Sequence, residues 1–74
     1  MRFFLTHIPP PRAPPGCSIV LHGHTHAVRD ETDPLGVRWL NPGCITQPRG
    51  GERPSFAWLT VEGGRVAGWE WVRL

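Results

Sequence analysis

Proline and glycine divide this sequence into short segments. The 74-residue chain contains nine of each, and they gather at residues 9–16, 34–36, 42–43, 48–51 and 63–64. Proline fixes φ and lacks a backbone donor, and glycine favours turns, so both interrupt helices and central strands. The stretches between them show no helical period over ten residues. The pattern therefore predicts short strands and loops, and it excludes a helical bundle.

Five of the segments have the composition of β-strands. They are residues 2–6, 18–23, 37–40, 56–62 and 65–72. The last two are joined by Gly63 and Gly64, a pair typical of a hairpin turn because both residues can take positive φ. We expect residues 9–15 to form a stiff extended connector and residues 30–36 to form an acidic turn. The sequence alone thus predicts a mostly β chain with a C-terminal hairpin.

The size and charge of the chain exclude several classes of protein. A chain this short buries a marginal core, to which we expect the four tryptophans (Trp39, Trp58, Trp69 and Trp71) to contribute. The net charge is +2 and the eight arginines are scattered, so no basic stripe indicates nucleic-acid binding. No apolar run approaches the roughly 20 residues that cross a membrane, and the first residues do not resemble a signal peptide. These features favour a cytoplasmic protein in which Cys17 and Cys44 remain thiols.

Three histidines lie within five residues, directly after an apolar segment. They are His22, His24 and His26. On an extended backbone, alternate side chains point to the same side, and imidazoles placed in this way suit a Zn, Mn, Fe or Ni centre. The alternative is a solvated strand end that carries three polar residues. The density of histidines and their position after a buried strand favour the metal.

A longer pattern surrounds these histidines. Residues 19–26 read Ile-Val-Leu-His-Gly-His-Thr-His, and residues 40–49 read Leu-Asn-Pro-Gly-Cys-Ile-Thr-Gln-Pro-Arg. In this order the two strings resemble the C-terminal part of calcineurin-like metallophosphoesterases, most closely the small bacterial and archaeal phosphodiesterases of that superfamily. The resemblance covers nearly the whole chain. It implies a metal-dependent phosphoester hydrolase and a single partial domain over residues 1–74, the C-terminal half of an α/β sandwich.

The resemblance also implies roles for individual residues. His24 and His26 match the two metal-ligating histidines of the family's last motif, and His7 matches a separate upstream ligand. Three further residues are expected beside the metals or at the substrate: His22, Asn41 and Arg49. The full family site holds two divalent metal ions, with Mn²⁺, Zn²⁺, Fe and Ni as the candidates.

The chain departs from the family pattern in its acidic residues. Family enzymes begin with Asp-x-His and continue to a bridging aspartate and an Asn-His motif, whereas the only aspartates here are Asp30 and Asp33. Two cations about 3.5–4 Å apart need a bridging carboxylate between them. We therefore expect half of a site, which an N-terminal half or self-association would complete to act on a phosphoester substrate. The alternative is a non-catalytic β module that binds a single metal or a protein partner.

Overall fold

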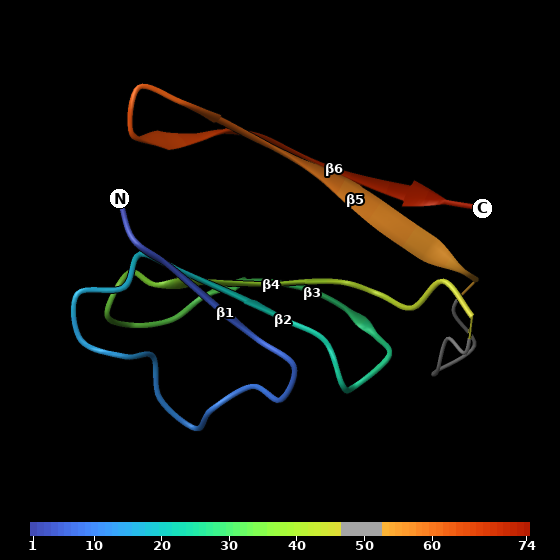
Figure 1. The fold of residues 1–74 in the computed structure, drawn as a ribbon, viewed down its shortest axis with the longest axis horizontal. Helices are drawn as coiled ribbons and strands as arrows, with labels where there is room; N and C mark the ends of the chain where they lie inside the picture. The colour runs from blue at the N-terminus through green and yellow to red at the C-terminus, as the bar shows by residue number, and fades with distance from the viewer. Residues whose placement is uncertain (47–52) are drawn as a thin grey trace.

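The chain folds into a four-stranded mixed sheet and a two-stranded hairpin (Figure 1). The structure is a computed structural model that describes residues 1–46 and 53–74. Its strands are β1 (Phe3–Thr6), β2 (Ile19–His22), β3 (Val28–Thr32), β4 (Arg38–Pro42), β5 (Ser55–Glu62) and β6 (Arg65–Arg73). The mostly β architecture and the C-terminal hairpin are confirmed. The described part of the chain contains no helix long and apolar enough to cross a membrane.

The four-stranded sheet has the order β1-β2-β4-β3. Strands β1, β2 and β4 run parallel, and Leu21 of β2 pairs with Leu5 on one side and Leu40 on the other. Parallel strands are usually covered on both faces and read as continuous apolar runs. This explains why β2 contains Ile19 and Val20 in succession, both of them buried.

One face of this sheet packs against the proline-rich connector. Val20, Val37 and Trp39 form the buried cluster, and Ala13 and Cys17 of the β1–β2 connection pack against it. The connection lies on the opposite side of the sheet from the hairpin (Figure 1). A proline-rich segment therefore performs the covering role that a crossover helix has in many parallel sheets.

Strand β3 corrects the expectation of a turn over residues 30–36. Val28–Thr32 pair with β4 in antiparallel register. The segment lacks apolar alternation because it is an edge strand whose second half is exposed, so its stability comes from pairing and from contacts such as that between Asp30 and Arg38. The turn itself is shorter, and the Asp33 carboxylate closes it by accepting the backbone N–H groups of Leu35 and Val37 at 2.9 and 3.0 Å.

The hairpin has the predicted turn and one face toward the sheet. Gly63 and Gly64 both take positive φ, 58° and 74°. Trp69 pairs with Leu59, and both line the space between hairpin and sheet. Trp58 alternates to the other face and is 65% exposed. The prediction that Trp58 belongs to the core is therefore wrong, because a hairpin packed on one side leaves its other face in solvent.

Ser55 joins the hairpin to the sheet. Its hydroxyl donates to the Pro42 carbonyl at 2.9 Å, and its backbone N–H donates to the Cys44 carbonyl at 3.1 Å. Gly43 passes directly beside this hydroxyl with a φ of 88°, and a Cβ there would overlap the Ser55 oxygen. Cys17 and Cys44 are thiols, as expected, rather than a disulfide.

Candidate metal centre

The candidate ligands gather at one edge of the four-stranded sheet. His7 follows β1, the loop of residues 23–26 follows β2, and Asn41 lies near the end of β4. These strands run parallel, so their carboxyl ends meet at the same edge. A hydrogen bond of 3.1 Å from the Gly23 N–H to the His7 carbonyl joins the first two loops. The strand order therefore brings together residues that are far apart in the sequence.

His7 and His24 face each other across these two loops. Their rings are nearly perpendicular, with centroids 5.1 Å apart, and His7 Nε2 lies 3.4 Å from His24 Nδ1. Two nitrogen ligands about 2.0–2.1 Å from one tetrahedral zinc ion stand about 3.3 Å apart. The two ring nitrogens thus fit the spacing of two ligands on one metal ion, and both side chains are exposed to solvent.

His26 lies further along the same loop. The backbone does not stay extended beyond His22, because His24 and His26 take φ values of 67° and 59°. The expected strand-like alternation of three histidines therefore does not hold. No three histidine, cysteine or acidic side chains within residues 1–46 and 53–74 form a group that could hold a metal ion. The role of His26 as a ligand stays a prediction.

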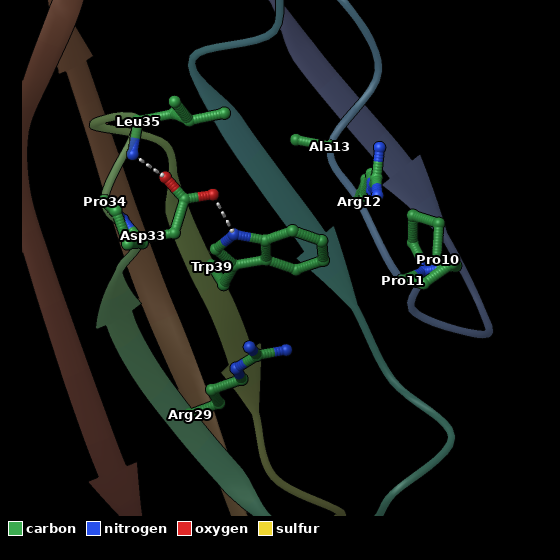
Figure 2. Close-up of a pocket in the computed structure, with 9 residues that line it drawn as sticks. All are labelled: Pro10, Pro11, Arg12, Ala13, Arg29, Asp33, Pro34, Leu35 and Trp39. Carbon is green, nitrogen blue, oxygen red and sulfur yellow. Dashed lines mark hydrogen bonds between the residues drawn. The ribbon is translucent and has the colours of Figure 1, made fainter.

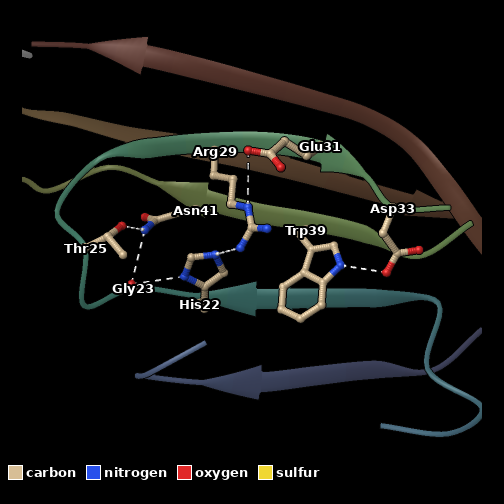
Figure 3. A network of polar contacts seen from close by, with 8 residues as sticks. All are labelled: His22, Gly23, Thr25, Arg29, Glu31, Asp33, Trp39 and Asn41. Carbon is tan, nitrogen blue, oxygen red and sulfur yellow. Dashed lines mark hydrogen bonds and ion pairs between the residues drawn. The ribbon is translucent and has the colours of Figure 1, made fainter. Parts of the chain in front are cut away.

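His22 is buried, and both of its ring nitrogens are engaged (Figure 3). Nδ1 donates to the Gly23 carbonyl at 3.0 Å, and Nε2 accepts a hydrogen bond from Arg29 at 3.2 Å. Arg29 in turn lies over the ring of Trp39, with Cζ 4.8 Å from the ring centroid, and pairs with Glu31 at 3.5 Å. A histidine with both nitrogens engaged has no lone pair for a metal. In this arrangement His22 lies beside the facing histidines rather than among them.

Asn41 is fully buried next to the same loop. Its amide donates to the Gly23 carbonyl at 3.2 Å and to the Thr25 hydroxyl at 3.0 Å, while its carbonyl oxygen accepts the Gly43 N–H at 2.9 Å. Its hydrogen-bonding groups are therefore used on the chain itself, where they hold the loop that carries His24.

Sequence reasoning missed two residues that shape this edge, Arg29 and Thr25. Arg29 stands opposite Asn41 on β3, and without a prediction of β3 nothing indicated that it reaches His22. The only sequence signal for Thr25 is its place between His24 and His26 in the histidine motif, which does not indicate that its hydroxyl bonds Asn41. The predicted site residue Arg49 lies outside the described residues.

The two aspartates are engaged elsewhere. Asp30 accepts two hydrogen bonds from the Arg38 guanidinium, at 2.9 and 2.8 Å, which lower the pKa of Asp30. Asp33 accepts the indole N–H of Trp39 at 3.0 Å and the backbone N–H of Val37, and these bonds lower the pKa of Asp33. Both carboxylates stabilise the β3–β4 pair.

An apolar cavity adjoins His7 between the sheet and the hairpin. It has a volume of about 570 Å³, with Leu5 and Leu21 in one wall and Leu59 and Trp69 in the other. This volume is within the range of small-molecule sites, about 300–1,000 Å³. The space beside the histidine pair is thus large enough to admit a further group or segment.

A second cavity of about 540 Å³ lies on the other face of the sheet. Figure 2 shows Trp39 at its centre, with the proline segment on one side and the β3–β4 turn on the other. None of the four histidines lines it. We therefore treat it as separate from the candidate metal centre.

Comparison with known proteins identifies the family. The calcineurin-like phosphoesterase superfamily domain matches residues 5–64, a span that includes His7, the histidine loop, Asn41 and the hairpin turn. No curated protein matches the chain. The fold is consistent with this match, because the mixed sheet and antiparallel hairpin are those expected of part of such a domain. The chain belongs to the calcineurin-like phosphoesterase superfamily, whose activity is the metal-dependent hydrolysis of phosphoesters.

Proposed function

We propose that this chain supplies the histidine ligands of a metal-dependent phosphodiesterase or phosphatase centre. The observation that supports the proposal is the 3.4 Å separation of His7 Nε2 and His24 Nδ1, which is suited to two ligands of one divalent ion. His26 is the third ligand in this proposal, because it belongs to the same loop. Zn²⁺, Mn²⁺, Fe and Ni are the candidate ions, since all accept neutral imidazole.

The chain's own residues bind and orient in this proposal. His7 and His24 act as neutral imidazoles, because a metal ion binds the lone pair of an unprotonated ring nitrogen. Gly23 lies directly beside the His7 ring, since a Cβ at this position would be in van der Waals contact with His7 Nδ1 at 3.7 Å. A divalent ion held there would polarise a phosphoryl oxygen and lower the pKa of a bound water.

The carboxylates of a two-metal centre would come from another polypeptide segment. Asp30 and Asp33 are engaged in hydrogen bonds within the β3–β4 pair. Strand β1 is an edge strand with Leu5 79% exposed. The buried indole N–H of Trp71 has no acceptor among the residues that the structure describes. The unpaired edge of β1 and the unsatisfied donor on β6 each favour the packing of a further segment.

Metal retention tests the ligand assignment. The purified chain is loaded with Zn²⁺ or Mn²⁺, dialysed, and analysed for metal content, alone and as the variants His7→Ala, His24→Ala and His26→Ala. We expect each substitution to reduce retained metal sharply. The Cys17→Ser/Cys44→Ser double variant is the control, because it removes the thiols that could bind zinc adventitiously, and it should retain metal like the parent chain. Parental retention in both His24→Ala and His26→Ala would overturn the assignment.

One observation favours a second candidate function, a non-catalytic module that binds a single metal. The donors that face each other are two neutral imidazoles, and the described residues place no carboxylate with them. Neutral ligands can hold one divalent ion but do not offset the repulsion between two. The two functions differ in whether an added carboxylate-bearing segment produces turnover.

A further inference from the structure

We propose that Asn41 is a positioning residue that holds His24 opposite His7 before any metal is bound, and that it acts through the carbonyl group of Gly23. The proposal rests on the proposed function for the role of His24 as a ligand. In this proposal a residue of β4, Asn41, preorganises the loop that follows β2.

The turn at His24 is of an uncommon kind. The Thr25 N–H donates to the Gly23 carbonyl at 2.8 Å, and His24 between them has a φ of 67°. A hydrogen bond between residues i and i+2 around a central residue of positive φ marks the rarer, strained form of the γ-turn. Strain of this kind persists only where the surroundings over-determine it, and it gathers at functional sites.

Asn41 spans this turn from its first residue to its third. One N–H of its amide bonds the Gly23 carbonyl and the other bonds the Thr25 hydroxyl, at 3.2 and 3.0 Å. Its Oδ1 is fixed by the Gly43 N–H, which leaves the amide a single orientation. Since Asn41 is fully buried, it has no water to exchange for these partners. The side chain therefore holds the two ends of the strained turn at a set separation.

The backbone of Gly23 links this turn to the loop that carries His7, and Figure 3 shows its carbonyl oxygen beside Asn41 and His22. Its carbonyl accepts from Asn41, from His22 Nδ1 and from the Thr25 N–H, while its N–H donates to the His7 carbonyl. His22 is itself oriented by Arg29 at Nε2. The N–H and the carbonyl of one residue, Gly23, thus connect the loop that carries His7 with the turn that carries His24.

The test compares Asn41→Asp with Ser55→Ala. Asn41→Asp preserves shape and the acceptor for Gly43, but it places an oxygen where the amide donated to Gly23. Ser55→Ala is the matched control, because it removes a buried hydrogen bond to Pro42 that anchors the hairpin instead of the histidine loop. Urea unfolding measures the loss of folding stability in each variant. A loss of His24 positioning can then be distinguished from general destabilisation.

Two readouts follow, and the first needs no metal. NMR of the metal-free chain measures the backbone φ of His24 from its three-bond coupling and detects the NOE between the rings of His7 and His24. We expect both signatures to be lost in Asn41→Asp and kept in Ser55→Ala. The second readout is Co²⁺ affinity from visible absorption, which should fall by roughly 10–100-fold in Asn41→Asp only, as is usual when a residue that orients a ligand is lost.

Each outcome decides a different question. An Asn41→Asp variant with the parental φ, NOE and Co²⁺ affinity would overturn the positioning role, as would equal losses in Ser55→Ala. If the NMR signatures are lost as expected but the parent chain binds no Co²⁺, the positioning of His24 stands and the proposed metal centre fails. Should Asn41→Asp not fold, Asn41→Ser, which removes the amide without adding a charge, replaces it with the same expectations.

Discussion

Two histidines of the loop after β2 lie in the left-handed region of backbone space, which is costly for any residue with a side chain. Gly23, which could take that conformation freely, precedes both of them. The cost therefore falls on His24 and His26, two of the residues that matter to the proposed function. Replacing His24 should accordingly have two separable effects, one on the imidazole and one on the backbone.

The first prediction separates the effect of losing the imidazole from the effect of backbone strain at His24. His24→Ala and His24→Gly both remove the imidazole, but only glycine adopts a φ of 67° without strain. We expect His24→Gly to be the more stable of the two by about 1 kcal/mol. Urea unfolding of both variants measures the difference. Equal stability, or a more stable alanine variant, would mean that the turn relaxes without strain once the ring is gone.

The second prediction concerns Asp33, whose pKa is lowered chiefly by the hydrogen bond from Trp39. A carboxyl group with a lowered folded-state pKa adds stability that is complete above its unfolded pKa and is lost as pH falls through the lowered value. The stability gap between the parent and Asp33→Asn should therefore stay constant from pH 7 to about pH 5 and narrow below that. Urea unfolding across this pH series measures the gap. A gap unchanged at pH 3 would refute the role of the ionised carboxylate.

At this scale the sequence indicated the chemistry better than the geometry. The spacing of His24 and His26 pointed to imidazole donors on an extended backbone, whereas both residues lie in a loop with positive φ, and their role as ligands stays a prediction. The positive φ of His24 could not be read from the local sequence, because the hydrogen bonds that span this turn come from Asn41, which is 17 residues from His24 and reaches the loop only after β4 pairs with β2. His22 shows the same limit, since its Nε2 is bonded by Arg29, which lies on a strand that the sequence did not reveal.

Among the elements, the junction of β4 and β5 depends on close contact between Gly43 and Ser55. We expect Gly43→Ala to destabilise the chain by about 2 kcal/mol, since the added methyl meets the Ser55 hydroxyl and φ is unfavourable. In the double variant Gly43→Ala/Ser55→Ala the hydroxyl is absent, so the loss should be smaller than the sum of the single losses by at least about 0.5 kcal/mol. Chemical denaturation of the four proteins completes the cycle, and additive losses would contradict the contact.

The strands should also differ in local stability. Strand β4 is hydrogen-bonded on both sides and contains the fully buried Leu40, whereas the hairpin has an exposed face and the connector has few backbone bonds. Native-state hydrogen exchange should therefore be slowest in β4, intermediate in residues 58–61 and 66–71, and fastest at Arg12, Ala13 and Gly16. Exchange that is uniform along the chain would contradict this order.

Strand prediction succeeded where apolar residues signal burial. The segments that became β1, β2 and β4 are apolar, and Gly63-Gly64 announced the hairpin. Strand β3 escaped because Val28–Thr32 is polar and its pairing with β4 depends on tertiary contacts such as that between Asp30 and Arg38. An edge strand is stabilised by pairing with a single neighbouring strand. That neighbour cannot be recognised from a short stretch of sequence.

At the scale of the whole molecule, we expect the isolated chain to be nearly inactive. We expect little or no hydrolysis of an activated phosphodiester such as bis(p-nitrophenyl) phosphate, even with excess Mn²⁺, because two neutral imidazoles do not neutralise a metal pair. Adding an N-terminal segment that carries the family's carboxylates, fused or in trans, should produce metal-dependent turnover that His26→Ala removes. Strong chelator-sensitive activity of the purified chain alone would refute the half-site interpretation.

The register of the hairpin also sets how the molecule responds to force. Ser55, where β5 leaves the sheet, pairs directly with Arg73, next to the C-terminus. Tension applied between the two ends of the chain therefore pulls these two residues apart first. The force then acts on the β5–β6 residue pairs one after another, from the open end of the hairpin toward its turn. In an optical trap the hairpin should open first and at low force, and the contour length should increase in a step that corresponds to β5, β6 and their turn while the four-stranded sheet is still folded.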